Sequence, residues 1–220
     1  MAGNDETWQL IHSERAALAD TLDTLSEDRW EAPSLCEGWT VKITAAHILA
    51  GAEQTGPGFL RGMVTSGFRF NAMMDRDARR IGTLEHREIV ARLRERTTTT
   101  NHPPAPVKAM LGEVVVHGAD ICQPLGLPTP SSTDATVACL DMFKDASFPV
   151  GGKKRVAGVR MIATDTDWSH GFGPEISGPA ASLLLVMTGR DAGLETVRGE
   201  GVALMRTRLS GPQGTSGRGR

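Results

Sequence analysis

The sequence predicts a mostly α-helical protein, with a helical bundle in the first two-thirds of its 220 residues and a small α/β part after it. Two observations support this fold class. Apolar residues recur at steps of three and four along the first part, as they do on the buried face of amphipathic helices. After about Ala146 an alternating, β-branched stretch typical of a strand appears. We therefore expect a bundle domain over 1–147, an α/β domain over 148–210 and a disordered tail, rich in Gly, Ser and Arg, over 211–220.

The elements of the bundle can be placed in order from spacing and helix-breaking residues. Four main segments and one short charged segment have helical spacing: 5–25, 41–55, 59–81, 107–122 and the charged 84–96. A loop over 32–39 precedes Thr40, which is a suitable N-cap for the second helix. Gly56, Pro57 and Gly58 end that helix, and a polar connector over 97–106 precedes the last one. Four main helices suit a bundle with a site between facing helices.

The second part is expected to contain both strands and helices. The stretch 151–165 has the alternation of a strand, and 167–176 is its expected hairpin partner. Residues 178–190 begin with proline near the first turn and end with glycine, an asymmetry typical of a helix. Another short element is predicted over 200–209.

Composition excludes several classes of protein. The 24 basic residues nearly balance the 26 acidic ones, so no electrostatic surface for nucleic acid is expected. No apolar run approaches 18 residues, and the acidic N-terminus lacks the apolar region of a secretory signal. The three cysteines have no C-x-x-C spacing and are expected to be reduced. We therefore expect a cytoplasmic protein that binds neither membrane nor nucleic acid.

The most informative motif is Glu113-Val-Val-Val-His117, which places a carboxylate and an imidazole one helical turn apart on one face. His47 lies far upstream in an equally apolar segment. Two histidines and a carboxylate from facing helices form a ligand set for a catalytic divalent metal with an open position. The apolar neighbours predict a buried helix, in which a buried Glu113 must be paired, protonated or bound to metal. The alternatives are a solvated Glu–His pair and a hydrogen-bonded core histidine.

Two segments resemble a known family. Pro33-Ser-Leu-Cys-Glu-Gly-Trp-Thr-Val-Lys-Ile-Thr-Ala-Ala-His47 resembles the P-S-x-C-x-G-W-T-V-x-D-x-x-x-H stretch of the mycothiol-dependent maleylpyruvate isomerase family, except that Ile43 stands where the family often has Asp. Glu113-Val-Val-Val-His117-Gly-Ala-Asp120 is similar to its second signature, E-x-x-x-H-G-x-D. A weaker likeness lies at Gly189-Arg190. The resemblance thus covers nearly the whole chain apart from the tail.

The resemblance implies a DinB-like four-helix bundle followed by a small α/β domain. It also implies a zinc ion held by His47, Glu113 and His117, with a low-molecular-weight thiol, mycothiol, as cosubstrate. Zinc with an open position can bind and deprotonate a thiol, whose thiolate is the nucleophile. The thiolate could add to an electrophilic alkene and leave again, as in cis–trans isomerisation, or stay attached, as in S-transfer. The sequence does not choose between these outcomes.

Other residues are weaker candidates. Arg190 and Arg206 are equal rivals for clamping a substrate or thiol carboxylate, and we expect the second domain to fold over the metal end of the bundle. Asp120 is either an orienting partner of a ligand or a surface or capping residue. Trp39 is expected to close the bundle by packing, with a wall of the thiol pocket as the alternative. Cys36 is expected to be structural, because its loop holds no nearby His or Lys. The remaining histidines are expected to be exposed: His12, His86, His102 and His170.

Two other functions remain open from the sequence. One is a DinB-like protein that binds metal without turnover. The other is a metal-dependent hydrolase, in which hydroxide attacks in place of a thiolate. A hydrolase needs a general base near the metal, and Asp120 is the only nearby candidate because Glu113 is already a ligand.

Overall fold

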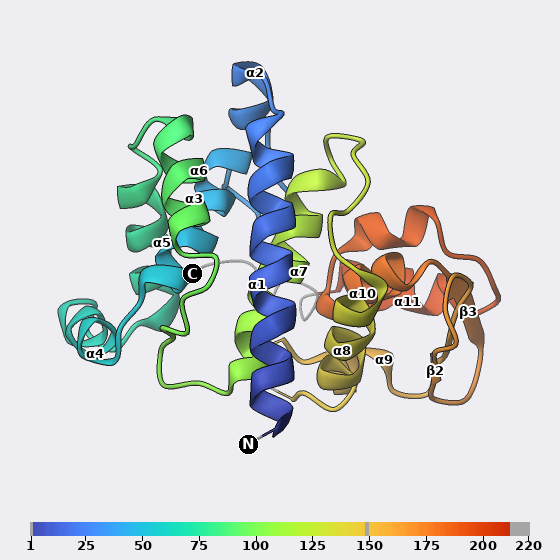
Figure 1. The fold of residues 1–220 in the computed structure, drawn as a ribbon. Helices are drawn as coiled ribbons and strands as arrows, with labels where there is room; N and C mark the ends of the chain where they lie inside the picture. Colours follow the sequence, from blue (N-terminus) through green and yellow to red (C-terminus); the bar gives the residue numbers. More distant parts are fainter. Residues whose placement is uncertain (1, 148–149, 212–220) are drawn as a thin grey trace. The chain divides into compact units, whose positions relative to one another are not determined.

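The computed structural model of the protein describes residues 2–147 and 150–211 (Figure 1). The chain divides into two compact units, of which the first ends at Ser131 and the second begins at Ser132. This division falls earlier than the expected boundary near residue 147, because the helix α8 (Thr133–Phe143) packs against α10 (Ala180–Thr188) of the second unit. The predicted tail over 211–220 lies outside the described residues, apart from Gly211.

The first unit is helical throughout. Its helices are α1 (Ala2–Asp23), α2 (Glu27–Trp30), α3 (Val41–Glu53), α4 (Gly56–Thr65), α5 (Phe70–Ile81), α6 (His86–Glu95) and α7 (Val107–Cys122). Four of them form a closed ring of contacts, in which α1 meets α7, α7 meets α3, α3 meets α6 and α6 meets α1. Together with the small sheet of the second unit, this bundle confirms the predicted fold class. The short charged helix α6 is the fourth member of the bundle.

The prediction of one continuous helix over 59–81 is wrong. Two helices, α4 and α5, occupy this stretch, and a turn at 66–69 separates them. Gly67 and Phe68 both have positive φ there, at 60° and 59°. A left-handed conformation at two successive residues ends an α-helix. As a consequence α5 packs on α3 instead of joining the ring of four helices.

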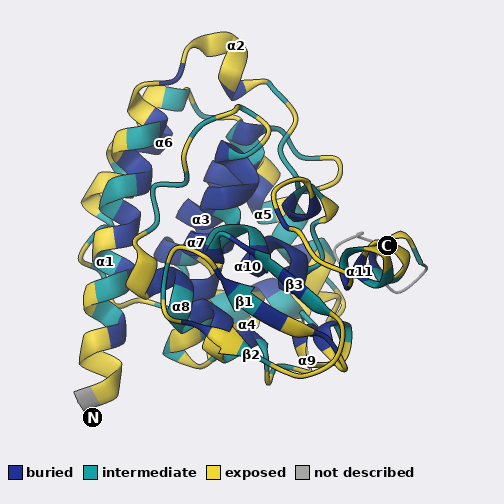
Figure 2. Ribbon diagram, turned by 90° about the vertical axis from the view of Figure 1, so that its right-hand side faces the viewer, coloured by how far each residue is buried: buried dark blue, intermediate teal, exposed yellow. Residues whose placement is uncertain are grey.

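Helices α3 and α7 carry the buried polar side chains Thr44, His47 and Asp120. Thr40 caps α3 as predicted, because its hydroxyl accepts a hydrogen bond from the backbone N–H of Ile43 at 3.3 Å. Nine residues of α3 are buried, and Figure 2 shows the helix as almost wholly buried. Burying each large apolar side chain, such as Leu49 at 0% exposure, contributes about 1.5–3 kcal/mol. A polar side chain on such a helix must therefore have a polar partner inside the bundle.

The second unit combines a small sheet with helices. Its elements after α8 are α9 (Gly152–Val156), β1 (Arg160–Ala163), β2 (Ser169–His170), β3 (Glu175–Gly178), α10 (Ala180–Thr188), a 3₁₀ turn (Asp191–Glu195) and α11 (Val202–Ser210). The strands lie in the order β2-β1-β3, with β1 antiparallel to β2 and parallel to β3. Helix α10 packs against β1, β3 and α8, and seven of its nine residues are buried.

The sequence predictions for this unit were correct in part. The antiparallel hairpin and the helix ending at Gly189, whose φ is 99°, are confirmed. The predicted strand over 151–165 is too long, since its first part forms α9 and the strand itself begins at Arg160. Helix α8 was not predicted as an element of this part of the chain.

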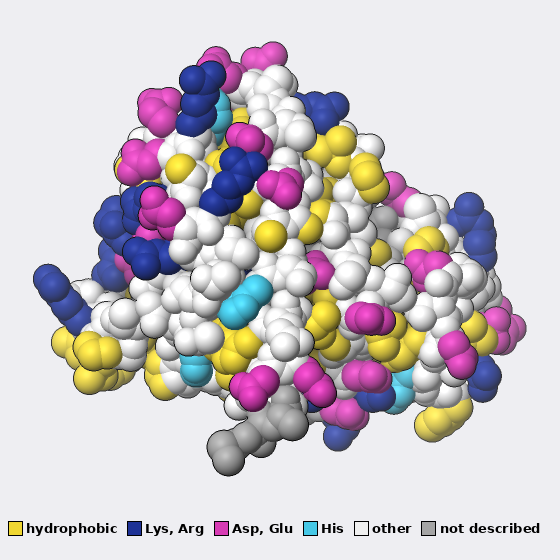
Figure 3. All heavy atoms as spheres, in the orientation of Figure 1, with side chains coloured by type: hydrophobic (Ala, Val, Ile, Leu, Met, Phe, Trp, Pro, Cys, Tyr) yellow, Lys and Arg dark blue, Asp and Glu magenta, His cyan; other side chains and the backbone are white. Residues whose placement is uncertain are grey.

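Large exposed apolar side chains gather on α4, the turn after it and the first residue of α5. Leu60, Val64, Phe68 and Phe70 are 45–71% exposed, and Figure 3 shows hydrophobic side chains over α4. In the described part of the chain, no helix combines the length and the apolar character that crossing a bilayer requires.

Candidate metal centre

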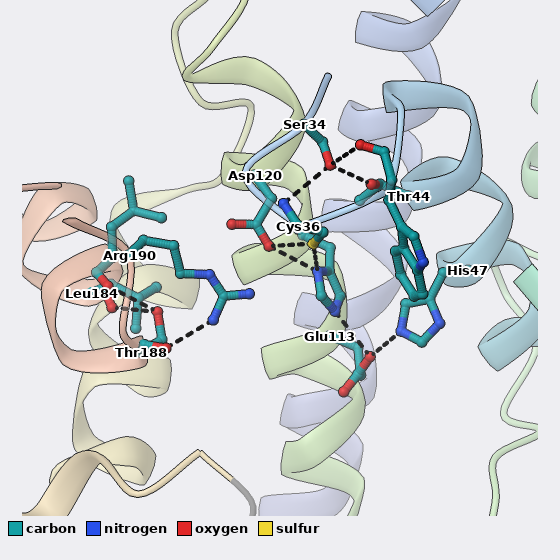
Figure 4. Close-up of polar contacts among 12 residues, drawn as sticks. Ser34, Cys36, Thr44, His47, Glu113, Asp120, Leu184, Thr188 and Arg190 are labelled. Atoms are coloured by element: carbon teal, nitrogen blue, oxygen red, sulfur yellow. Dashed lines mark hydrogen bonds and ion pairs between the residues drawn. The ribbon is translucent and has the colours of Figure 1, made fainter. Parts of the chain in front are cut away.

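Three side chains from two facing helices of the first unit converge on one point. His47 lies on α3, and Glu113 and His117 lie one turn apart on α7. The Oε2 atom of Glu113 lies 2.8 Å from Nε2 of His47 and 3.5 Å from Nε2 of His117. The two imidazole rings meet edge to face, with centroids 4.9 Å apart. The structure therefore brings together the three residues that the sequence singled out as metal ligands. Figure 4 labels two of them, His47 and Glu113.

The exposure of Glu113 differs from the expectation. His47 is only 5% exposed and His117 is half-buried, whereas the side chain of Glu113 is 47% exposed. The prediction of a buried Glu113 was wrong, because the apolar residues that surround it in sequence bury their side chains on other faces of α7. The cluster is consequently buried on its His47 side and accessible on its Glu113 side. A catalytic metal centre needs such an accessible side for water or substrate.

The imidazole of His117 has polar partners on both of its nitrogens. Its Nδ1 atom lies 2.9 Å from Oδ2 of Asp120 and 3.4 Å from Sγ of Cys36. Cys36 in turn donates to the same Asp120 oxygen at 3.2 Å. Asp120 is fully buried, so its predicted orienting role fits the structure and the surface alternative does not. A carboxylate on Nδ1 leaves Nε2 of His117 directed at Glu113, the arrangement typical of a metal-binding histidine.

The position of Cys36 corrects one expectation from the sequence. Its own loop indeed holds no histidine, but α7 supplies His117 from 81 residues further along the chain. The loop is fixed to α7 because the backbone N–H of Leu35 donates to the carbonyl of Asp120 at 3.0 Å. No pattern in the sequence pairs Cys36 with α7, so this contact could not be predicted.

Charges in the cluster favour an ionised Glu113 and a protonated His117 when no metal is bound. The partial loss of solvent around the half-exposed Glu113 would by itself raise its pKa, but hydrogen bonds from His117 and His47 hold that pKa well below its ordinary value. Burial alone would lower the pKa of His117, but the sulfur of Cys36 and the hydrogen bond to Asp120 raise that pKa well above its ordinary value. A metal ion would have to displace the proton from His117, since only neutral imidazole ligates.

The donor set fits a zinc ion. Two ligands at about 2.1 Å from a tetrahedral ion lie roughly 3.4 Å apart. The separations between Oε2 of Glu113 and the Nε2 atoms of the two histidines, 2.8 and 3.5 Å, bracket this value. Donor atoms of all three residues lie within 4.8 Å of one another. Cys36, His117 and Asp120 form a second group that meets the same distance criterion. The second group would use Nδ1 of His117, whereas the first would use its Nε2, which faces the exposed Glu113.

The other histidines are not exposed, contrary to the expectation. All four are half-buried, and each ring contacts a tryptophan. Trp8 contacts His12 and His102, Trp30 contacts His86, and Trp168 contacts His170, with ring centroids 5.5–6.3 Å apart. Among the described residues, none of these histidines belongs to a potential metal-binding group. Their rings have packing roles that helical spacing alone does not indicate.

The two arginines singled out in the sequence differ in their surroundings within the second unit. Arg190 follows α10 and is half-buried, and its Nη1 donates to the carbonyl of Thr188 at 2.8 Å. Arg206 is exposed on α11. A guanidinium that is already held by the backbone is better prepared to bind a carboxylate than a mobile one.

Two further arginines of the second unit were not singled out. Arg155 donates to the carbonyls of Val150 and Met187 at 3.0 and 2.6 Å, and Arg208 donates to the carbonyl of Arg155 at 2.7 Å. Burial first, and then the charge of Arg190, lower the pKa of Arg155. Both residues therefore serve the fold around the end of α10.

Fold and site together define a helical-bundle protein with a candidate metal centre of two histidines and one glutamate. Residues 11–103 match the family described as mycothiol maleylpyruvate isomerase N-terminal domain. The family predicted from the motifs is thereby confirmed for this segment, which contains His47 but ends before Glu113.

Solved structures support the likeness of the whole fold. The crystal structure of the mycothiol-dependent maleylpyruvate isomerase matches with a TM-score of 0.57 and 15% identity, over 90% of this chain and 92% of that one. A histidine-to-alanine mutant of that isomerase matches over the same shares with a TM-score of 0.56 and 15% identity. At this identity the match establishes a shared fold. A search of curated proteins gives no match.

Proposed function

We propose that the chain is a zinc-dependent enzyme that activates a low-molecular-weight thiol, mycothiol or a close relative, for attack on an electrophilic small molecule. The observation that carries this proposal is the convergence of His47, Glu113 and His117 at the accessible edge of a buried polar cluster. These three residues would hold the metal. Zinc bound there would supply a Lewis acid with an open position, able to keep a thiol as thiolate at neutral pH.

The chain's own residues prepare this centre in distinct ways. Asp120 accepts the Nδ1 proton of His117 and so presents Nε2 to the ligand position. Glu113 is held ionised by the two imidazoles, and its exposed side marks where a thiol would approach. We assign carboxylate binding on the thiol or substrate to Arg190, which the backbone holds in place, and keep the exposed Arg206 as its rival.

Isomerisation is the outcome that the comparisons support better. The solved proteins of this fold carry the name maleylpyruvate isomerase. In such a reaction the thiolate sulfur adds to one alkene carbon, the former double bond rotates, and elimination returns both the thiolate and the trans alkene. S-transfer shares the first step, but the carbanion formed by the addition then takes a proton in place of eliminating the thiolate, so that the thioether remains. The choice between them belongs to the substrate pocket.

Asp120 is unsuited to be the general base that the hydrolase alternative needs. Asp120 was the only candidate for activating water, but it is fully buried and already bonded to His117 and Cys36. A general base must reach the proton it removes, directly or through one water molecule. The geometry therefore supports thiol chemistry over hydrolysis.

The test measures metal content first and thiol chemistry second. We expect about one zinc per chain in the wild type, and at least a hundredfold weaker binding in His47→Ala and His117→Ala. His102→Ala is the matched control, because His102 is a half-buried histidine of the same unit outside the cluster. With maleylpyruvate and mycothiol, turnover should require both metal and thiol. Full zinc occupancy in both ligand variants would refute the ligand set, and equal turnover without metal would refute the mechanism.

A further inference from the structure

The two proposed histidine ligands are supported differently. His117 has Asp120 on its Nδ1 atom, as metal-binding histidines usually have an acceptor there. The Nδ1 atom of His47 is buried and has no hydrogen-bond partner among the described residues. Rotation of an imidazole about its last side-chain bond has broad, roughly two-fold preferences. Some other contact must therefore fix the ring of His47 with Nε2 toward Glu113.

Besides Glu113 and His117, which also contact this ring, the indole of Trp39 lies against it. Its ring centroid lies 5.1 Å from that of His47, with the planes tilted by 50°. Trp39 itself sits in a turn with a tightly bonded backbone. Its carbonyl accepts from both the N–H and the hydroxyl of Ser34, at 3.0 and 3.1 Å, and that hydroxyl lies 2.8 Å from the hydroxyl of Thr44 on α3. The turn thus carries the indole at a fixed distance from the helix that bears His47.

An ion pair on a neighbouring helix holds the indole from its other end. The Nε1–H of Trp39 donates to Oδ1 of Asp75 on α5 at 2.9 Å. Arg79, one turn later, donates to both oxygens of Asp75 at 2.9 and 3.0 Å and to the carbonyl of Gly38 at 3.3 Å. Burial would raise the pKa of Asp75, but the hydrogen bonds from Arg79 and Trp39 lower it, so Asp75 remains an ionised acceptor.

We propose that Trp39 is a positioning residue that fixes the imidazole of His47 for metal binding, and that Asp75 and Arg79 hold Trp39 in place. The inference rests on the proposed function, since it assigns a partner to one of the proposed ligands. It explains how a histidine without an acceptor on Nδ1 can still be preorganised. It also gives α5, which lies outside the ring of four helices, a role in the metal centre.

The experiment measures metal affinity, with Zn²⁺ by competition against a chelator and with Co²⁺ by its absorption bands. Loss of an orienting partner typically weakens metal binding 10- to 100-fold. We expect a loss in that range for Trp39→Leu and a smaller loss for Trp39→Phe, which keeps an aromatic face. Asp75→Ala should weaken binding severalfold, and Asp75→Asn, which keeps a carbonyl acceptor for the indole, should restore most of the affinity.

The matched control is Trp8→Leu. Trp8 is another half-buried tryptophan that contacts histidine rings, but its partners lie outside the cluster. We expect its metal affinity to equal that of the wild type. A second readout is spectroscopic, because the Co²⁺ bands report coordination geometry. They should shift in Trp39→Leu and stay unchanged in Trp8→Leu. Bound Co²⁺ should also quench a component of tryptophan emission that Trp39→Leu lacks.

The outcomes separate this inference from the function on which it rests. A wild type that binds neither metal would overturn the proposed metal centre. A wild type that binds metal, with Trp39→Leu matching the Trp8→Leu control in affinity and spectrum, would overturn only the role of Trp39. If circular dichroism shows that Trp39→Leu does not fold, Asp75→Ala decides the question. The side chain of Asp75 is 44% exposed, so its removal leaves no cavity, and unchanged affinity in that variant would refute the inference.

Discussion

At the scale of single residues, the candidate metal centre is a network of contacts around the imidazole of His117. His117 faces Glu113 and His47 through Nε2, and Asp120 and Cys36 through Nδ1. The buried Asp120 accepts hydrogen bonds behind His117, and the opposite side of the cluster is open at Glu113. The residues behind His117 should therefore affect metal affinity without touching the metal.

Asp120→Asn tests that statement directly. The amide can still accept a hydrogen bond from His117, but it lacks the charge that favours the metal-binding form of the ring. We expect zinc affinity to fall 10- to 100-fold, measured by chelator competition. Asp20→Asn is the control, because Asp20 lies exposed on α1 and pairs with Arg94 of α6. Equal affinities in the two variants would show that the bond between Asp120 and His117 has no part in the site.

The three cysteines should differ sharply in reactivity. Burial raises the pKa of Cys122 to about 11, and both Cys122 and Cys139 are buried, whereas Cys36 is half-buried. At pH 8 we expect iodoacetamide to label Cys36 first and Cys122 hardly at all, as peptide mass spectrometry can measure. Faster labelling of Cys122 than of Cys36 in the folded protein would contradict this order.

The same pKa predicts how stability depends on alkaline pH. Below pH 9 the Cys122 thiol is protonated in both the folded and the unfolded chain, so it adds no pH dependence. Between pH 9 and about 11 the unfolded chain loses this proton and the folded one keeps it. The free energy of unfolding should then fall as pH rises, by about 3 kcal/mol in total for this group. Cys122→Ala should reduce that alkaline loss in urea titrations.

At the scale of secondary structure, α3 and α7 position the site because each is buried nearly along its whole length. Local signals mark the start of α3 and the end of α7. The hydroxyl of Thr40 begins α3, and Gly126, whose φ is 65°, lies in the turn after α7. The prediction of one continuous helix over 59–81 was wrong because Phe68 adopts a positive φ, a conformation that is rare for phenylalanine and that its residue type does not indicate.

Thr40→Val should destabilise the protein by about 1 kcal/mol, the usual value of a lost N-cap. The substitution keeps the shape of the side chain but removes the hydroxyl that accepts from Ile43. Thr40→Ser keeps that hydroxyl and serves as the control. Urea unfolding followed by circular dichroism measures both. Similar losses in the two variants would mean that the methyl group, and not the cap, stabilises α3.

At the scale of the whole molecule, the two units carry different parts of the proposed activity. All proposed metal ligands, together with Asp120 and Trp39, lie in the first unit, and Arg190 and Arg206 lie in the second. The first unit should therefore bind metal by itself. The second should be needed only when a charged thiol or substrate has to be held.

A chain truncated after Ser131 tests this division. We expect it to bind zinc within about threefold of the full chain, measured by chelator competition, and to lose thiol-dependent turnover. The cut belongs at 131, because a chain ending near 147 would leave α8 without the partner α10 that buries its apolar face. In the full chain, Arg190→Ala combined with Arg206→Ala should lose turnover but keep the metal. Full activity in either form would refute a functional second unit.

The helical fold class, the start of α3, the bounds of α7 and the three candidate ligands could be predicted from the sequence, because they depend on periodicity, capping and residue spacing. The end of α3 could not, since Gly56, Pro57 and Gly58, which were expected to end it, form the first turn of α4. The surroundings of these ligands, in contrast, depend on how the helices and turns pack together. Asp120 lies three residues after His117, but the other partners, Cys36 of His117 and Trp39 of His47, come from the turn before α3. Asp75 of α5 in turn holds Trp39. Neighbours so distant along the chain leave no local pattern. The predicted burial of Glu113 was wrong for a related reason, because an apolar helix does not reveal which of its faces the rest of the fold leaves uncovered.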